Sequence, residues 1–305
     1  MTTRVDTGRY PSALIPGVVA AFYGRAVERY PAVYKQFMEM KKTNKAQETF
    51  VAETGLGLPS IKGESASIQY TTFGEFARKR INIESWGLGF VISKELVDDN
   101  QYKELALQST DGLAQSMELN REFQSALLLD RAFSASYTGY DGVALCSTAH
   151  VLGNGGTTSN RLATDQDISQ LAIQDMVTLI GLQVDEVGLP QYLQPDKLLV
   201  HVSNRHAATE ILETKYQLNT MNNNVNSIEV NNYIKGGMVV SPYVGDQDAF
   251  FVTTNAPNGL IMLDKQSAMF ETDYDVDRKA WKVNVWQRYK ADFVNYRKVI
   301  GTPGV

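Results

Sequence analysis

The stretch that decides the fold runs from Phe76 to Phe133 and reads FARKRINIESWGLGFVISKELVDDNQYKELALQSTDGLAQSMELNREFQSALLLDRAF. Its second part, from Tyr102 onward, contains no proline and one glycine, Gly112, so the sequence predicts a single long helix. At ~1.5 Å per residue this helix is on the order of 48 Å long, whereas a compact chain of this size has a radius of gyration of about 19 Å. The helix should therefore cross the whole molecule.

The first part, residues 76–92, reads as an extended segment that leads into the helix. Asp98, Asp99 and Asn100 lie at the junction between the two. Adjacent carboxylates face different directions on a helix and cannot work as a paired acid and base, so we expect these residues to cap the helix start.

Composition excludes several classes of function. The chain has 305 residues, of which 43% are apolar, enough for a sizeable core in one large domain or two to three small ones. With a net charge of −5, the surface as a whole lacks the positive charge that would bind nucleic acid or an anionic membrane. One cysteine and three histidines exclude an internal disulfide and leave few ligands for a metal. We expect no metal, cofactor or membrane span, and folding in a reducing cytoplasm.

The N-terminal half predicts two units before the long helix. Residues 1–45 should form a polar arm and a helix from about residue 16 to residue 40, kinked at Pro31. Residues 46–92 should form a long hairpin with a mobile tip at 55–63. Ile68, Tyr70 and Thr72 alternate with polar residues, but such a strand has too little apolar area for a core. It is either a solvated flap or is buried against another chain.

The C-terminal half predicts a compact αβ domain at 151–257 and a long strand after it. The domain should contain a helix near 168–184 capped by Asp165 or Asp167, a strand at 194–203, a helix capped by Ser203 or Asn204, an Asn-rich loop and two short strands. In residues 281–293 apolar and polar side chains alternate with a period of two. This strand should span ~40 Å and lie along the long helix.

No catalytic motif stands out. The chain has neither a GxxxxGK[ST] phosphate loop nor a GxSxG motif. Cys146 and His150, with Asp141, can be drawn as a nucleophile and its base, but a polar loop that follows a core element explains them better. We therefore expect no catalytic residues.

Other residues suggest contacts between chains. The basic run Arg78-Lys79-Arg80 fits a solvated face or salt bridges to an acidic neighbouring subunit, and the Asn-rich stretch at 222–232 fits a loop at a symmetric contact. Tryptophans such as Trp86 fit packing better than a ligand box. The candidate inter-subunit contacts are Ile61, Lys62, Gln69, Tyr70, Arg78, Lys79, Arg80, Glu84, Trp86, Asn222, Asn223 and Asn224.

The order of these segments resembles a known family. The junction GLGFVISKELVDDNQY matches a "gxxisxelxeDDxy" pattern, and Leu145, Ser147 and His150 match an "lFsxxH" pattern in which Cys146 replaces the aromatic residue. Both patterns resemble the Mu-like major head subunit branch of tailed-phage major capsid proteins, which have the Hong Kong 97-type capsid fold.

The resemblance implies an α+β fold with an N-terminal arm (1–45), an extended E-loop hairpin (46–92), a peripheral domain with a spine helix and long strands (93–150 and 258–305), and an axial domain (151–257). It implies a major capsid protein that assembles as hexamers and pentamers into an icosahedral shell. The shell would enclose double-stranded DNA without sequence-specific binding, in a virion assembled in the host cytoplasm.

The resemblance also implies partners. No long helical scaffolding segment precedes residue 16, so we expect a separate scaffolding protein or a processed chain. We also expect a portal, and the resemblance leaves a decoration protein open. Two alternatives remain open: an encapsulin-like nanocompartment shell, and a hydrolase that uses His150 with Cys146 or Asp141.

Overall fold

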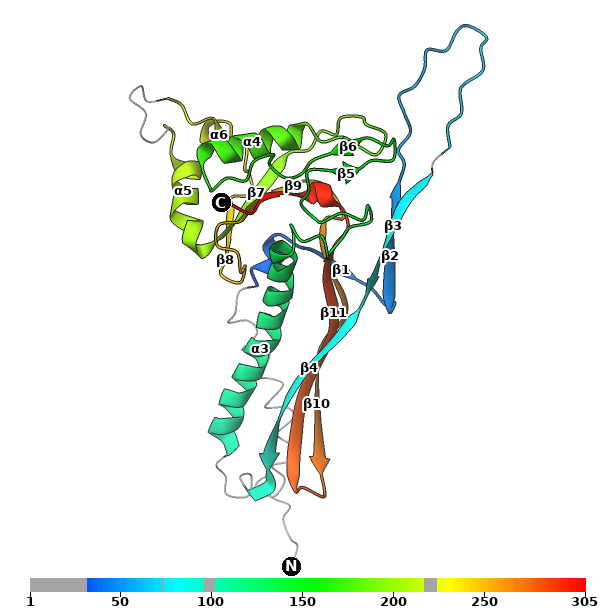
Figure 1. Ribbon diagram of the computed structural model, residues 1–305. Helices are drawn as coiled ribbons and strands as arrows, with labels where there is room; N and C mark the ends of the chain where they lie inside the picture. The colour runs from blue at the N-terminus through cyan, green and yellow to red at the C-terminus, as the bar shows by residue number, and fades with distance from the viewer. Residues whose placement is uncertain (1–31, 73, 96–101, 217–223) are drawn as a thin grey trace, which may run out of the picture.

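The computed structural model describes residues 32–72, 74–95, 102–216 and 224–305 (Figure 1). The fold is α+β, and its long axis is formed by one helix and one sheet that run side by side (Figure 1). Several sequence expectations lie outside the described residues: the helix at 16–31, the caps at 98–100, and Asn222 and Asn223.

The long sheet has four strands in the order β1-β10-β11-β4. Its strands are β1 (Glu39–Lys42), β4 (Glu84–Ser93), β10 (Leu260–Asp275) and β11 (Ala280–Phe293). β10 and β11 form an antiparallel hairpin, β4 is antiparallel to β11, and β1 is parallel to β10. Segments from both halves of the sequence therefore build one sheet.

β11 confirms the alternation expected over residues 281–293. Val283, Val285 and Tyr289 are buried, whereas Lys282 and Asn284, at alternate positions, are exposed. Side chains of a strand point alternately to its two faces, so one face of β11 supplies the core and the other meets solvent.

The long helix is α3 (Tyr102–Asp130), which confirms the expected spine. With 29 residues it is about 44 Å long. Leu113, Ala114 and Met117 are buried around Val285 of β11. Together α3 and the long sheet form the elongated part of the molecule (Figure 1).

A second sheet has the order β12-β9-β7-β8 and carries its own helices. Its core contains Ile173, Met176, Leu198, Phe250 and Ile300. The elements are β7 (Pro195–His201), β8 (Met238–Ser241), β9 (Phe250–Thr254), β12 (Val299–Thr302), α4 (Gln170–Gly181), α5 (Arg205–Glu213) and α6 (Ser227–Val230).

The C-terminal strand β12 belongs to this second sheet, although the sequence groups residues 258–305 with the long helix. Val299 pairs with Thr253 of β9, and β9 also pairs with β7. The chain thus crosses from one sheet to the other between β11 and β12. Short elements complete the chain: η2 (Tyr34–Gln36), β5 (His150–Val151), β6 (Thr157–Thr158), η3 (Val202–Asn204) and η4 (Tyr296–Lys298).

Two expectations about this domain are wrong, and one holds in position. Ser169 caps α4 by accepting a hydrogen bond from the amide of Ala172 at 3.2 Å, whereas Asp165 pairs with Arg161. α5 begins directly after Asn204, as expected, although the Asn204 side chain makes no capping hydrogen bond. The Asn-rich loop contains a short helix, α6, because the side chain of Asn226 caps it.

The helix expected through residue 40 is also wrong in its described part. Residues 34–36 form a 3-10 turn, and Glu39–Lys42 pair with Ile261–Asp264 of β10 as strand β1. The partner strand lies more than two hundred residues away in the sequence, so a local sequence pattern does not reveal this pairing. The hydrogen bonds to β10 outweigh the helix propensity of these residues.

A hairpin of β2 (Gln47–Glu53) and β3 (Glu75–Asn82) extends from the other side of the molecule. Residues 54–72 between these strands, here called the hairpin loop, project away from the body (Figure 1). The strand expected near Ile68, Tyr70 and Thr72 is wrong: this loop contains no strand, because no neighbouring segment offers its backbone a ladder.

Candidate assembly surfaces and a buried polar junction

The hairpin loop exposes apolar side chains that no described part of the chain covers. Residues 55–72 are all exposed, and Leu58, Ile61 and Tyr70 have relative exposures of 79%, 101% and 90%. Lys62 is also exposed, and Gln69 accepts a hydrogen bond from Ser60 at 2.9 Å. A projecting loop that holds several large apolar side chains in solvent is typical of a surface that binds a partner.

The residues of the basic run on β3 make different contacts. The Arg78 guanidinium pairs with Glu75 of the same strand at 2.7 Å, and Arg80 is exposed. Lys79 instead lies 2.7 Å from the carboxylate of Asp292 and 3.6 Å from the ring centre of Phe293. Burial lowers the pKa of Lys79, while Asp292 acts in the opposite direction. Lys79 therefore fastens the hairpin to the end of β11 within its own chain.

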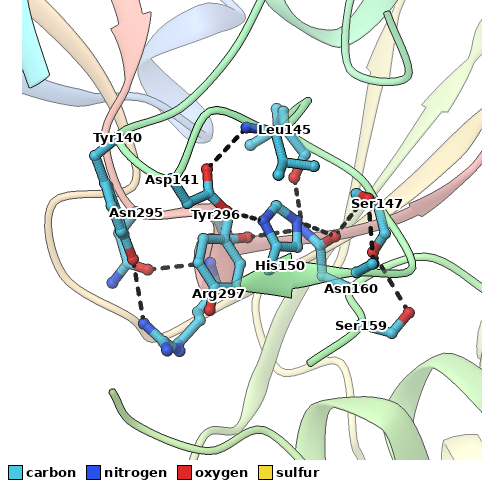
Figure 2. Close-up of polar contacts among 12 residues, drawn as sticks. Tyr140, Asp141, Leu145, Ser147, His150, Ser159, Asn160, Asn295, Tyr296 and Arg297 are labelled. Carbon is cyan, nitrogen blue, oxygen red and sulfur yellow. Dashed lines mark hydrogen bonds and ion pairs between the residues drawn. The ribbon is translucent and has the colours of Figure 1, made fainter. Parts of the chain in front are cut away.

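A buried polar junction lies where the loop after α3 meets the C-terminal segment (Figure 2). Asn160 is fully buried, and its Nδ2 donates to the carbonyl oxygens of Leu145, Tyr296 and Val299 at 2.7, 3.1 and 2.9 Å. Its Oδ1 accepts from the amide of Ser147 at 2.8 Å. One side chain thus joins the loop after α3 to the segment that leads into β12.

His150 completes this junction. Its Nδ1 lies 2.5 Å from Oδ2 of Asp141, and its Nε2 lies 2.9 Å from Oδ1 of Asn160. The imidazole stacks on the ring of Tyr296, with centroids 3.7 Å apart. Figure 2 shows the His150 ring held between Asp141 and Asn160.

The Cys146 thiol has none of the properties of a nucleophile. The residue is 1% exposed, and burial raises the pKa of the thiol well above its ordinary value. Both ring nitrogens of His150 face groups other than the thiol, namely Asp141 and Asn160. The Cys-His arrangement that would support a hydrolase is not formed.

A buried ion pair lies beside the junction. Nη1 of Arg297 is 2.9 Å from the carboxylate of Glu186, and the Tyr140 hydroxyl donates to the same carboxylate at 3.1 Å. The Nε of Arg297 donates to the carbonyl oxygen of Val184 at 2.8 Å. These contacts attach the loop before β7 to η4.

Comparison with known proteins assigns the family. The family model described as phage capsid protein matches residues 77–301, well over half of the chain. The chain belongs to the phage capsid protein family. This family suggests a structural protein of the virion, and the chain functions as a major capsid protein. An enzyme-loaded nanocompartment is not favoured.

Solved structures share the capsid protein's fold. A virus-like particle from Pyrococcus furiosus is 10% identical, with a TM-score of 0.55, and the match covers 93% of this chain and 97% of that one. The capsid of Myoviridae phage XM1 is 12% identical, with a TM-score of 0.54 and coverages of 90% and 92%. The capsid of the native GTA particle is 12% identical, with a TM-score of 0.54 and coverages of 88% and 88%. The Hong Kong 97-type fold is thereby confirmed. No curated protein sequence matches the chain.

Two other residues expected at subunit contacts are engaged within the capsid protein itself. Glu84 pairs with Lys290 at 2.5 Å, and Trp86 stacks on Tyr289 with ring centroids 6.0 Å apart. Trp86 therefore serves as a packing residue. Asn224 is exposed.

The junction residues Asn160, Glu186 and Arg297 were missed by sequence reasoning. A lone buried Asn has no sequence signature, and the partners of Arg297 lie more than one hundred positions away. The one available signal was His150 in the "lFsxxH" pattern, which drew attention to the loop without indicating its structural role.

The described residues contain no group of three or more His, Cys, Asp or Glu side chains placed to hold a metal. Nor does this part of the chain include a helix with the length and apolar character needed to cross a bilayer.

Proposed function

We propose that the capsid protein assembles as hexamers and pentamers into an icosahedral shell that encloses double-stranded DNA. The observation that carries this proposal is the exposed hairpin loop, whose apolar side chains are not covered by any residue that the structure describes. In a shell, each loop lies across a neighbouring subunit and buries Ile61 and Tyr70 there.

We propose a separate role in the shell for each of the expected domains. The hairpin at 46–92 reaches the neighbour, the spine and long strands at 93–150 and 258–305 form the periphery, and residues 151–257 meet at capsomer centres. Strand β12 ties the last two together through the second sheet. The contacts proposed to face neighbours are Ile61, Lys62, Gln69, Tyr70, Arg78, Arg80 and the Asn-rich loop with Asn224.

The charge of the subunit supports a container for DNA rather than a DNA-binding protein. With a net charge of −5, the shell avoids adhering to its contents, since phosphate contacts need concentrated Lys and Arg. We propose that the protein catalyses no reaction and assembles in the host cytoplasm. Its proposed partners are a separate scaffolding protein and a portal, and the proposal leaves open whether a decoration protein binds the shell.

Deletion of residues 55–63 tests the proposal. The expected result is a folded subunit, by circular dichroism, that no longer forms particles, because the deleted residues make no contribution to the subunit's own core. Ile61→Asp should impair assembly in the same way, and Ile61→Val should retain it because it keeps an apolar side chain. Normal particles from the Ile61→Asp subunit would contradict the proposal.

A further inference from the structure

The hydrogen bonds of Asn160 fix which way its amide points. Nδ2 faces three carbonyl oxygens, and Oδ1 faces the amide hydrogen of Ser147. Reversing the amide would set an oxygen against three oxygens and an N–H against an N–H. Oδ1 is therefore the atom that faces Nε2 of His150, and Nε2 must carry a hydrogen to bond it at 2.9 Å.

The other ring nitrogen of His150 also faces an acceptor, because Nδ1 lies 2.5 Å from Oδ2 of Asp141. A neutral imidazole carries a hydrogen on one nitrogen only, and an imidazolium carries one on each. We propose that His150 and Asp141 form a buried imidazolium–carboxylate pair, which makes the junction between the loop after α3 and the C-terminal segment dependent on a proton.

The surroundings favour placing the second proton on His150 rather than on Asp141. The other carboxylate oxygen of Asp141 accepts from the amide of Val143 at 3.3 Å. Lys79 of β3, a cation, interacts electrostatically with Asp141. Among the described residues, Tyr296 interacts electrostatically with Asp141, and the nearby Arg297 and Glu186 neutralise each other as an ion pair.

Loss of the proton has a structural consequence. The lone pair of Nδ1 would then face a carboxylate at hydrogen-bond distance, and both groups are buried, with side-chain exposures of 0% and 1%. Neither group can turn to water without opening the junction. The attachment of β12's leading segment to the loop after α3 should therefore weaken when the proton leaves.

Nitrogen NMR of the unassembled subunit with labelled histidine tests the proton count. The chain has three histidines, so His201→Gln and His206→Gln assign the His150 signals while leaving the junction untouched. The expected result at about pH 7.5, a unit above the ordinary histidine value, is a hydrogen on both ring nitrogens of His150. A single protonated nitrogen, or a proton located on Asp141, would overturn the proposal.

A pH series on Asp141→Asn gives an independent readout. The Asn amide donates to an unprotonated Nδ1, so this variant accommodates a neutral imidazole. Unfolded histidine releases its proton above about pH 6.5, so a native state that keeps the proton should lose up to about tenfold in its folding equilibrium constant per pH unit above that value. The wild-type subunit should show this loss and the variant should not. Parallel profiles for the two proteins would contradict the proton-dependent junction.

Discussion

The side chain of Arg121 in the middle of α3 donates from Nε to Oε1 of Gln287 in β11 at 3.0 Å, and both residues are buried. The same guanidinium lies 3.4 Å from the carboxylate of Asp264 in β10 and 4.8 Å from the ring centre of Tyr289. One cation thus fixes the spine helix to both long strands. The relative position of the two longest elements depends on this contact.

Replacing this cation should destabilise the subunit strongly. Arg121→Met leaves Asp264 and Gln287 without their partner, and breaking a buried ion pair from one side costs roughly 3–5 kcal/mol. Urea unfolding of the unassembled subunit measures the loss. Lys282→Ala is the control: it removes a more exposed pair with Asp275 and should cost far less. Equal losses in the two variants would contradict the proposed role of Arg121.

Two glycines should respond in opposite directions to alanine. A Cβ on Gly89 of β4 would lie 2.7 Å from the carbonyl oxygen of Val283, whereas one on Gly112 of α3 meets nothing within 4 Å. Gly89→Ala should therefore cost about 1–3 kcal/mol through strand displacement. Gly112→Ala should stabilise the helix by up to about 1 kcal/mol. Thermal unfolding of both variants measures the two changes in stability. If Gly89→Ala did not destabilise the subunit, β4 and β11 would not be paired in this register.

The buried Lys79 predicts a pH dependence with a defined sign. Burial lowers its pKa, so between the folded and unfolded values the native state binds fewer protons than the unfolded state. Stability from this group should therefore rise with pH up to the ordinary lysine value of about 10.4. Against Lys79→Met, the wild-type subunit should gain stability as the pH rises toward that value. A constant difference in unfolding free energy would show that Lys79 is not buried.

The Cys146 thiol should not react in the folded subunit. It is buried, and its raised pKa keeps it in the protonated form that reacts poorly. A thiol reagent at about pH 8 should modify it only as fast as the chain unfolds, and completely in urea. Rapid stoichiometric modification of native protein would contradict this placement.

The elements that the sequence predicts well are those with local signals. α3 follows from a long proline-free run, and β11 follows from alternation that needs no knowledge of its partner. β1 was missed because its ladder with β10 joins residues far apart in the chain. The cap of α4 was misplaced because Asp165, Asp167 and Ser169 are all acceptable caps, and only the backbone geometry selects Ser169.

For the candidate assembly surfaces too, the sequence predicts what depends on local signals and misses what depends on distant partners. The low apolar content of the hairpin loop was sufficient to predict that it lies outside the core. Lys79 and Trp86 look like surface residues in sequence, but Asp292 and Tyr289, which cover them, are some two hundred positions away. Sequence patterns show which side chains are available for contacts, and the fold determines which of them its own chain uses.

The central claim is that the hairpin loop joins one subunit to the next. Electron cryomicroscopy of particles formed on co-expression with the scaffolding protein measures this directly. The account predicts a closed shell in which residues 55–72 of each copy lie on a neighbouring copy, with Ile61 and Tyr70 buried between them. A shell in which every loop folds back on its own subunit, or a protein that stays a monodisperse monomer under all assembly conditions, would contradict it.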